Sequence, residues 1–283
     1  MTKRNLPIIL AMTAICAFSA PSLAQTDSLK LPARSGPRWL GYTFLGMEYV
    51  VAPIIASQFW WKHALAKNPL KNVYEQEPYL EDKLWHFWNG ENITDFNYWV
   101  MKRYLGHDSP WKAMGMTMLT LTAVEVLDAS DAKARWGFSV RDQLANMGGI
   151  GLWYLKHKFP RIPVDVRVGI RRWDRIPTFV SQSWRYPANF DKPLAATTPH
   201  LDKYSVLKAE IIVRPYNYFY VGFASSLKNG SDGWGISKNL FGITAGFDVI
   251  RWYAQKHKTK ASPYLMTFGR YFSESPCYTH WYY

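Results

Sequence analysis

The spacing of apolar and polar residues changes near Pro160, from a helical period to a period of two. Before that point, long apolar and aromatic stretches are interrupted by polar residues three or four positions apart, which is typical of helices. After it, apolar and polar residues alternate one by one, which is typical of half-buried strands. The pattern therefore predicts an α+β protein, with an N-terminal helical bundle that holds an internal polar cluster. An antiparallel β-rich domain follows it, as a small sheet or barrel.

The first apolar stretch covers residues 39–61 and is long enough to cross a bilayer. Glu48 and Gln58 are its only strongly polar interior residues, and Pro53 lies in its middle. Three interpretations are open: a spanning helix, a helix at the membrane interface, and a buried helix kinked at Pro53. Because a carboxylate that faces lipid is costly, Glu48 favours a buried or interfacial helix over a span.

Two later helices carry recognisable start signals. Ser109 is a suitable N-cap, with Pro110 at the first helical position. Ser139, followed three residues later by Asp142, resembles a capping box with Asp in place of Glu or Gln. The glycines within residues 148–151 weaken that helix, but they allow another helix to approach it closely.

Strict alternation marks the strands in the second half of the chain. It covers residues 164–171 and recurs over residues 241–249. Residues 211–213 and 218–223 flank a turn and predict a hairpin. An outer-membrane barrel would need about eight spanning strands of ~9–11 residues each, which residues 159–283 barely accommodate. The pattern therefore favours a sheet that packs on the helices or lies at the membrane surface.

Basic residues outnumber acidic ones by 34 to 21, which gives the chain a formal net charge of +13. Such an excess suits an anionic partner, either lipid head groups or nucleic acid. Arginines gather early in the second half, at Arg167, Arg171, Arg172 and Arg175. The simplest interpretation of this group is a solvated face, and contact with anionic lipid is the functional alternative.

The N-terminus has the three parts of a secretory signal peptide. Two basic residues precede an apolar core over residues 6–20, and a small-x-small cleavage site ends at Ala24. We therefore expect removal of residues 1–24, and a mature protein of net charge +11 in the periplasm or at the outer membrane. Export argues against nucleic acid as a partner and leaves membrane lipid or another anionic envelope component. Only Cys277 would remain, which excludes an intrachain disulfide.

The change of pattern also divides the mature chain. Residues 25–38 are polar and contain proline, which predicts a flexible lead-in. Residues 39–158 are expected to form the helical domain, and residues 159–283 the β-rich domain.

Three pairs of titratable or amide side chains lie on the otherwise apolar helices. Residues three or four apart share a helix face, and each pair has that spacing. The pairs are Asp82 with His86, Glu125 with Asp128, and Asp142 with Asn146. If the helices pack together, all six groups converge on one polar pocket.

Three interpretations of this cluster are open. As a metal site, Asp82 and His86 would supply two ligands, and Glu125, Asp128 or Asp142 would complete the shell around a divalent ion. As a catalytic site, His86 would be a general base that a carboxylate orients, although the sequence marks no nucleophile. As a structural site, the groups would satisfy one another and fix the helix register.

The order of these motifs resembles that of YfiM-type periplasmic proteins of unknown function and, more distantly, of VanZ-like membrane proteins. The order is Asp-Lys-x-x-His-Phe, then Glu-x-x-Asp, then Gly-Phe-Ser-x-x-Asp-x-x-Ala-Asn-x-x-Gly. The matching positions are Asp82, Lys83, His86, Phe87, Glu125, Asp128, Gly137, Phe138, Ser139, Asp142, Ala145, Asn146 and Gly149. The resemblance covers roughly residues 39–158 and implies an exported, envelope-associated helical domain without an established reaction. Lipid anchoring is not carried over, because this chain lacks a lipobox and has a long β-rich extension.

These observations favour an exported envelope protein that associates with a membrane and binds or organises envelope lipid. The alternative is a hydrolase that acts on lipid or cell-wall substrate. In that case His86 would be the base, and Glu125, Asp128 and Asp142 would orient it or bind a metal.

Overall fold

The computed structural model describes residues 36–51, 80–130, 138–171, 207–216, 218–227, 239–257, 265 and 278–282. The helices are α2 (Arg38–Gly46), α4 (Leu80–Val100), α5 (Pro110–Ser130), α6 (Val140–Lys158) and α9 (Val249–His257), and the π-helical turns η1 (Met47–Val51) and η3 (Met101–Leu105) continue α2 and α4. The strands are β1 (Val164–Ile170), β2 (Leu207–Tyr216), β3 (Phe219–Leu227), β4 (Asn239–Phe247) and β5 (Tyr278–Tyr282). Helices dominate the first half and strands the second, so the predicted α+β class is confirmed.

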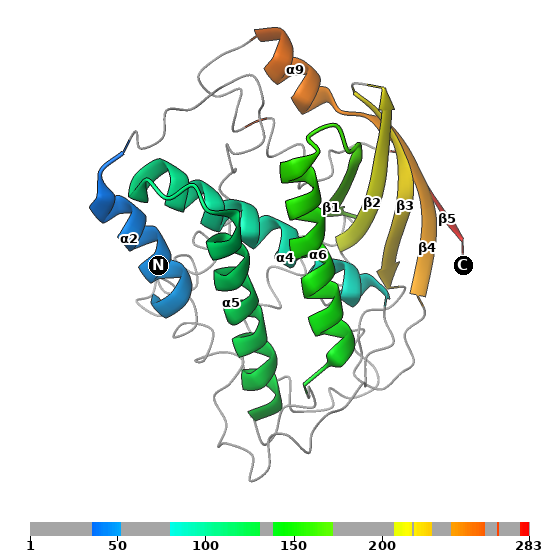
Figure 1. Ribbon diagram of the computed structural model, residues 1–283. Coiled ribbons are helices and arrows are strands. Elements are labelled where there is room, and N and C mark those ends of the chain that lie inside the picture. Colours follow the sequence, from blue (N-terminus) through cyan, green and yellow to red (C-terminus); the bar gives the residue numbers. More distant parts are fainter. Residues whose placement is uncertain are drawn as a thin grey trace, which may run out of the picture.

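The five strands form one antiparallel sheet in the order β1-β2-β3-β4-β5. The predicted hairpin is confirmed, since β2 pairs with β3 and places Val213 opposite Val221 and Tyr216 opposite Phe219. Helix α6 lies between α5 and the sheet in Figure 1, and α4 contacts β1, β2 and β3. Trp88 of α4 packs against Val166 of β1, so helices and sheet share part of one core.

The start signals read from the sequence are confirmed at two helices. Helix α5 begins at Pro110, and α6 begins directly after Ser139. The Ser139 hydroxyl accepts a hydrogen bond from the backbone N–H of Asp142 at 3.2 Å, which satisfies one of the free N–H groups of the first turn. This cap fixes where α6 begins and therefore where Asp142 lies.

Helices α4 and α6 cross with their backbones in contact at two glycines. A Cβ atom on Gly149 would lie 1.9 Å from the carbonyl oxygen of Phe87, and one on Gly90 would lie 2.3 Å from the carbonyl oxygen of Asn146. No side chain fits at either position, which confirms that the glycines of α6 allow a second helix to approach closely. The contact holds the His86 end of α4 against the Asn146 turn of α6.

The apolar stretch predicted over residues 39–61 is described only as far as Val51. Within it, α2 ends at Gly46 and η1 continues it. Glu48 is 7% exposed, and its carboxyl accepts a hydrogen bond from the Asn97 amide at 3.3 Å. Glu48 therefore faces the protein interior. In the parts of the chain that the structure describes, no helix combines the length and the apolar character needed to cross a membrane.

Two expectations for the second half are wrong. The alternation predicted a strand up to Val249, but β4 ends at Phe247 and Val249 is the first residue of α9. Between them, Asp248 is buried and its carboxylate accepts hydrogen bonds from Arg167 and Arg214, which turns the chain inward. Arg167 itself is 0% exposed, so it does not belong to a solvated face.

The structure describes only one of the other three arginines of that group. Arg171 is partly buried, whereas Arg172 and Arg175 lie outside the described residues.

The glycine contact between α4 and α6 gives the first testable prediction. We expect Gly149→Ala to lower the free energy of unfolding by about 3 kcal/mol, because the new methyl group overlaps the backbone of α4. Gly151→Ala is the matched control on the same helix, where a Cβ atom meets nothing within 4 Å. It should raise the free energy of unfolding by up to about 1 kcal/mol, since alanine favours helix more than glycine does. Equal effects of the two substitutions in urea denaturation would contradict the close contact.

Glu48 gives a second prediction, on the dependence of stability on pH. Burial raises the pKa of Glu48 to about 8, against which the hydrogen bond from Asn97 acts only partly. The unfolded chain ionises this group above the ordinary glutamate pKa of 4.5, so its contribution to stability is lost as the pH rises from about 4.5 to 8. We expect Glu48→Gln to raise the free energy of unfolding by about 2 kcal/mol at pH 7, and by much less at pH 4. A gain of the same size at both pH values would contradict a buried, neutral Glu48.

Candidate functional site

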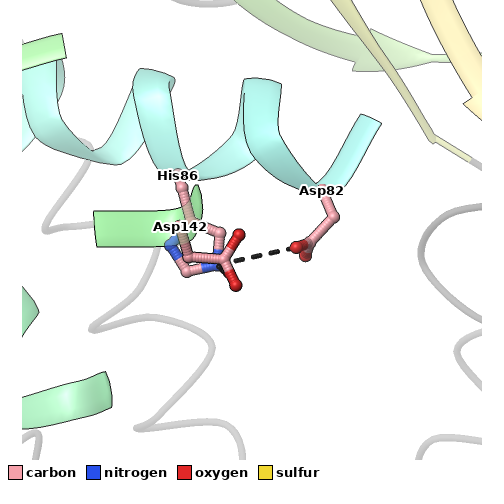
Figure 2. Close-up of side chains that lie close together, drawn as sticks. All are labelled: Asp82, His86 and Asp142. Carbon is pink, nitrogen blue, oxygen red and sulfur yellow. Dashed lines mark ion pairs between the residues drawn. The ribbon is translucent and has the colours of Figure 1, made fainter. Parts of the chain in front are cut away.

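Polar groups approach both ring nitrogens of His86, which lies on α4 beside the crossing with α6. On one side, Nδ1 is 3.3 Å from Asn146 Oδ1 and 3.5 Å from Glu125 Oε1. On the other side, Nε2 is 3.9 Å from Asp82 Oδ2 and 3.8 Å from Asp142 Oδ2. Figure 2 shows the His86 ring and the Asp82 carboxylate on α4, with Asp142 beside them. Residues from three helices therefore surround one imidazole.

Lys83 belongs to the same group, although the sequence analysis did not select it as a site residue. Its Nζ lies 3.1 Å from Asp82 Oδ2 and also donates a hydrogen bond to Asp142 Oδ1. Burial opposes the charge of Lys83, but the two aspartates outweigh burial and raise the pKa of the amine. The signal in the sequence was the position of Lys83 directly after Asp82, inside the first motif.

Glu125 is the most deeply buried acid of the group, with 2% of its surface exposed. Burial, together with the charge of Asp142, raises the pKa of Glu125 to about 8. The charge of Asp128 acts in the same direction, and the backbone N–H of Ser139 acts against it by donating to Oε2 at 3.3 Å. Glu125 is therefore largely neutral at pH 7.

The structure thus gathers the three polar pairs that the sequence marks. His86 contacts Asp82, Asp142, Glu125 and Asn146 directly, and Asp128 acts on Glu125 through its charge. Their catalytic role stays a prediction, as does the role of any of them as a metal ligand.

Three of these side chains have donor atoms close enough to share an ion. One ligand atom each from Asp82, His86 and Asp142 lies within 4.8 Å of the other two. One imidazole and two carboxylates form a donor set that suits zinc or manganese. The His86 side chain is 20% exposed, so solvent and small ions reach the site.

A second buried cluster of charges, which the sequence pattern does not reveal, joins the helices to the sheet. The ammonium group of Lys156 on α6 contacts Glu91 of α4 and Asp165 of β1. Next to them, Arg167 Nη2 is 3.1 Å from Glu210 Oε2. These side chains are at most 5% exposed, and each faces an opposite charge. The cluster is therefore a structural contact between α4, α6 and the sheet.

On β2, β3 and β4 the opposite face of the sheet is mainly apolar and exposed, whereas on β1 the same face is buried against Trp88 of α4. Antiparallel pairing aligns nine residues of β2, β3 and β4 in three rows on this face, which we call the outer sheet face. The rows are Ile211–Phe223–Ile243, Val213–Val221–Ala245 and Tyr216–Phe219–Phe247. Seven of the nine expose between 37% and 76% of their surface. The alternate residues on the same strands are buried and include Glu210, Arg214 and Thr244, so the sheet is charged inside and apolar outside.

Aromatic rings border one end of the outer sheet face, next to α9. The rings of Phe219 and Phe247 are 5.1 Å apart, and those of Phe247 and Trp252 are 6.3 Å apart. The Lys256 ammonium lies 5.0 Å from the centre of the Trp252 ring, and His257 follows it at the end of α9. Aromatic and then basic side chains therefore follow the apolar rows.

Comparison of the chain with protein-family models, with curated proteins and with solved structures gave no significant match. The resemblance to YfiM-type proteins therefore depends on the sequence motifs alone.

The buried charges at the helix–sheet contact give a third prediction. We expect Lys156→Met to lower the free energy of unfolding by about 3–5 kcal/mol, because it leaves Glu91 buried without its cation. Lys158→Met makes the same substitution two residues later, at an exposed position. It should change the free energy of unfolding by less than about 0.5 kcal/mol. Urea denaturation of both variants measures the difference, and a small effect of Lys156→Met would contradict a structural role for this ion pair.

Proposed function

We propose that this protein is an exported cell-envelope protein that associates with membrane lipid through its outer sheet face. The observation that carries the proposal is the inversion of the sheet, with charged residues on the buried face and apolar residues on the exposed face. The expected signal peptide and the YfiM-type motifs support a location in the periplasm or at the outer membrane.

Exposure of the outer sheet face to water is energetically unfavourable. A sheet with one solvated face normally alternates apolar residues inward with polar residues outward. Here Val221 and Ile243 expose 51% and 55% of their surface on the outer face, while Glu210 on the inner face is completely buried. Strands that face lipid show this reversed alternation, and contiguous exposed apolar patches mark sites of interaction. Acyl chains of lipid are therefore the occupant that best fits the face.

The border of the face matches the polar edge of a bilayer. Tyrosine and tryptophan favour the boundary between acyl chains and head groups, and Tyr216, Trp252 and Tyr253 lie exposed at this end. Lys256 is close enough to reach anionic head groups next to these rings, where each basic residue contributes about 1 kcal/mol. The basic charge of the whole chain acts in the same direction.

The helices also expose apolar side chains, so the inversion extends beyond the sheet. On α6, Leu144, Met147 and Leu155 are between 47% and 60% exposed, and on α5 Trp111 and Leu119 are more exposed still. Meanwhile the interior holds the polar cluster around His86. The helical surface is thus consistent with the same lipid environment.

Flotation with lipid vesicles tests the proposal. Purified protein lacking residues 1–24 is mixed with phosphatidylethanolamine/phosphatidylglycerol vesicles and centrifuged through a density gradient. We expect the protein to float with the vesicles and to remain bound in 1 M salt, because apolar contacts are not screened. Val221→Asp and Ile243→Asp should each weaken binding about tenfold or more, since a charge on a lipid-facing strand is costly.

Two controls separate lipid contact from other effects. His107→Asp introduces the same acidic side chain at an exposed turn away from the sheet and should leave binding nearly unchanged. Val221→Thr preserves the branched shape without a charge and should have a smaller effect than Val221→Asp. The proposal is wrong if the protein does not float, if salt releases it, or if His107→Asp weakens binding as much as Val221→Asp.

A second candidate function is hydrolysis at the polar cluster of the same protein. The observation that favours it is the position of His86, whose Nδ1 lies beside Asn146 and Glu125 while Nε2 faces two aspartates. Such a histidine can serve as a general base or as a metal ligand. A general base needs no cation, whereas a metal ligand acts only with one.

A further inference from the structure

We propose that Asp82, His86 and Asp142 form a binding site for a divalent cation of the zinc or manganese class. We further propose that Lys83 fills the site when the cation is absent. This inference does not depend on the association of the protein with lipid.

The hydrogen bond at Nδ1 determines the tautomer of His86. Its nearest polar neighbour is Asn146 Oδ1, 3.3 Å from Nδ1, and an amide oxygen can only accept a hydrogen bond. The contact therefore places a proton on Nδ1. In the neutral ring Nε2 is then an acceptor with a free lone pair, which is the form that binds metals. A hydrogen bond at the other ring nitrogen is the usual means of orienting a histidine ligand.

The other ring nitrogen, Nε2, faces two carboxylates. On that side lie carboxylate oxygens of Asp82 and Asp142, at 3.9 and 3.8 Å. A lone pair and two carboxylates repel one another unless a positive charge lies among them. Metal–ligand bonds of about 2.1 Å at tetrahedral angles place ligand atoms roughly 3.4 Å apart. The three donor atoms lie within 4.8 Å of one another. Side-chain rotations that move the atoms by about 1 Å bring them to that separation.

Two buried polar atoms on the Nδ1 side of the ring also lack a hydrogen-bond partner among the described residues. Glu125 Oε1 accepts no hydrogen bond from the described residues, and Asn146 Nδ2 donates none. Glu125 is 2% exposed and Asn146 0%, and both side chains point at His86. Buried polar atoms are nearly always paired, so this gap indicates an ordered water on the Nδ1 side of the ring, opposite the carboxylates that Nε2 faces.

Lys83 partly offsets the negative charge of the two aspartates before a cation binds. Its Nζ lies 3.1 Å from Asp82 and also contacts Asp142, so it occupies the gap between the two carboxylates. A divalent cation that binds both aspartates must displace this ammonium group. Lys83 is therefore a competitor of the cation, and removing its charge should strengthen cation binding, whereas removing a ligand should weaken it.

Equilibrium dialysis with zinc or manganese, followed by elemental analysis, tests the site directly. The protein used is the purified chain lacking residues 1–24, in the absence of vesicles. We expect about one equivalent of bound cation per chain. His86→Ala and Asp142→Ala should each lower the affinity at least about tenfold, and Lys83→Gln should raise it by a comparable factor.

The opposite effects of the variants keep the test informative. A gain of affinity in Lys83→Gln cannot arise from misfolding, and circular dichroism checks the fold of the alanine variants. Lys102→Gln and His107→Ala are the matched controls, because they alter the same residue types on or after α4, outside the site, and should leave the affinity unchanged. The proposal is overturned if neither the wild-type protein nor Lys83→Gln binds a stoichiometric cation, or if binding is indifferent to His86→Ala.

Discussion

The close crossing of α4 and α6 is the constraint on which the arrangement of this protein depends. Gly90 and Gly149 allow the two backbones to touch, and any side chain at either position would force them apart. Because of this contact, His86 on α4 reaches Asn146 on α6. At the other end of α6, Lys156 meets Glu91 and β1. One helix contact thus positions both the polar cluster and the sheet.

This sheet has the opposite distribution of residues from a sheet with one face in water, because its charged residues are buried and its apolar residues are exposed. Its inner face pairs charges within the sheet, as between Glu210 and Arg167, and pairs Asp165 with Lys156 of α6, because a buried carboxylate is stable only when it is paired. On β2, β3 and β4 its outer face is left with mainly apolar side chains, as in the Val213–Val221–Ala245 row. The proposed association with lipid gives the two faces one explanation: charged groups gather at the helix–sheet contact, and apolar groups remain on the side that would face lipid.

The sequence predicts the fold class, the β2–β3 hairpin and the N-cap at Ser139, because periodicity and capping are local properties of the chain. It also marks the three polar pairs, but their convergence around His86 depends on the packing of the helices. It does not predict that Arg167 is buried. A period of two shows that alternate residues face opposite sides, but not which side is covered, and that depends on α4 and α6. The end of β4 at Phe247 was missed for a similar reason, since the pairing of Asp248 with Arg167 is a long-range contact.

The central claim is that the outer sheet face contacts acyl chains, and spin labels measure this most directly. In a variant without native cysteines, single labels are placed at 221 and 243 on the face and at the exposed positions 107 and 161 elsewhere. Power-saturation electron paramagnetic resonance in vesicles then compares collisions with oxygen, which concentrates in lipid, and with a water-soluble nickel complex. The account predicts high oxygen and low nickel accessibility at 221 and 243 only. Equal accessibility to nickel at all four positions would contradict it.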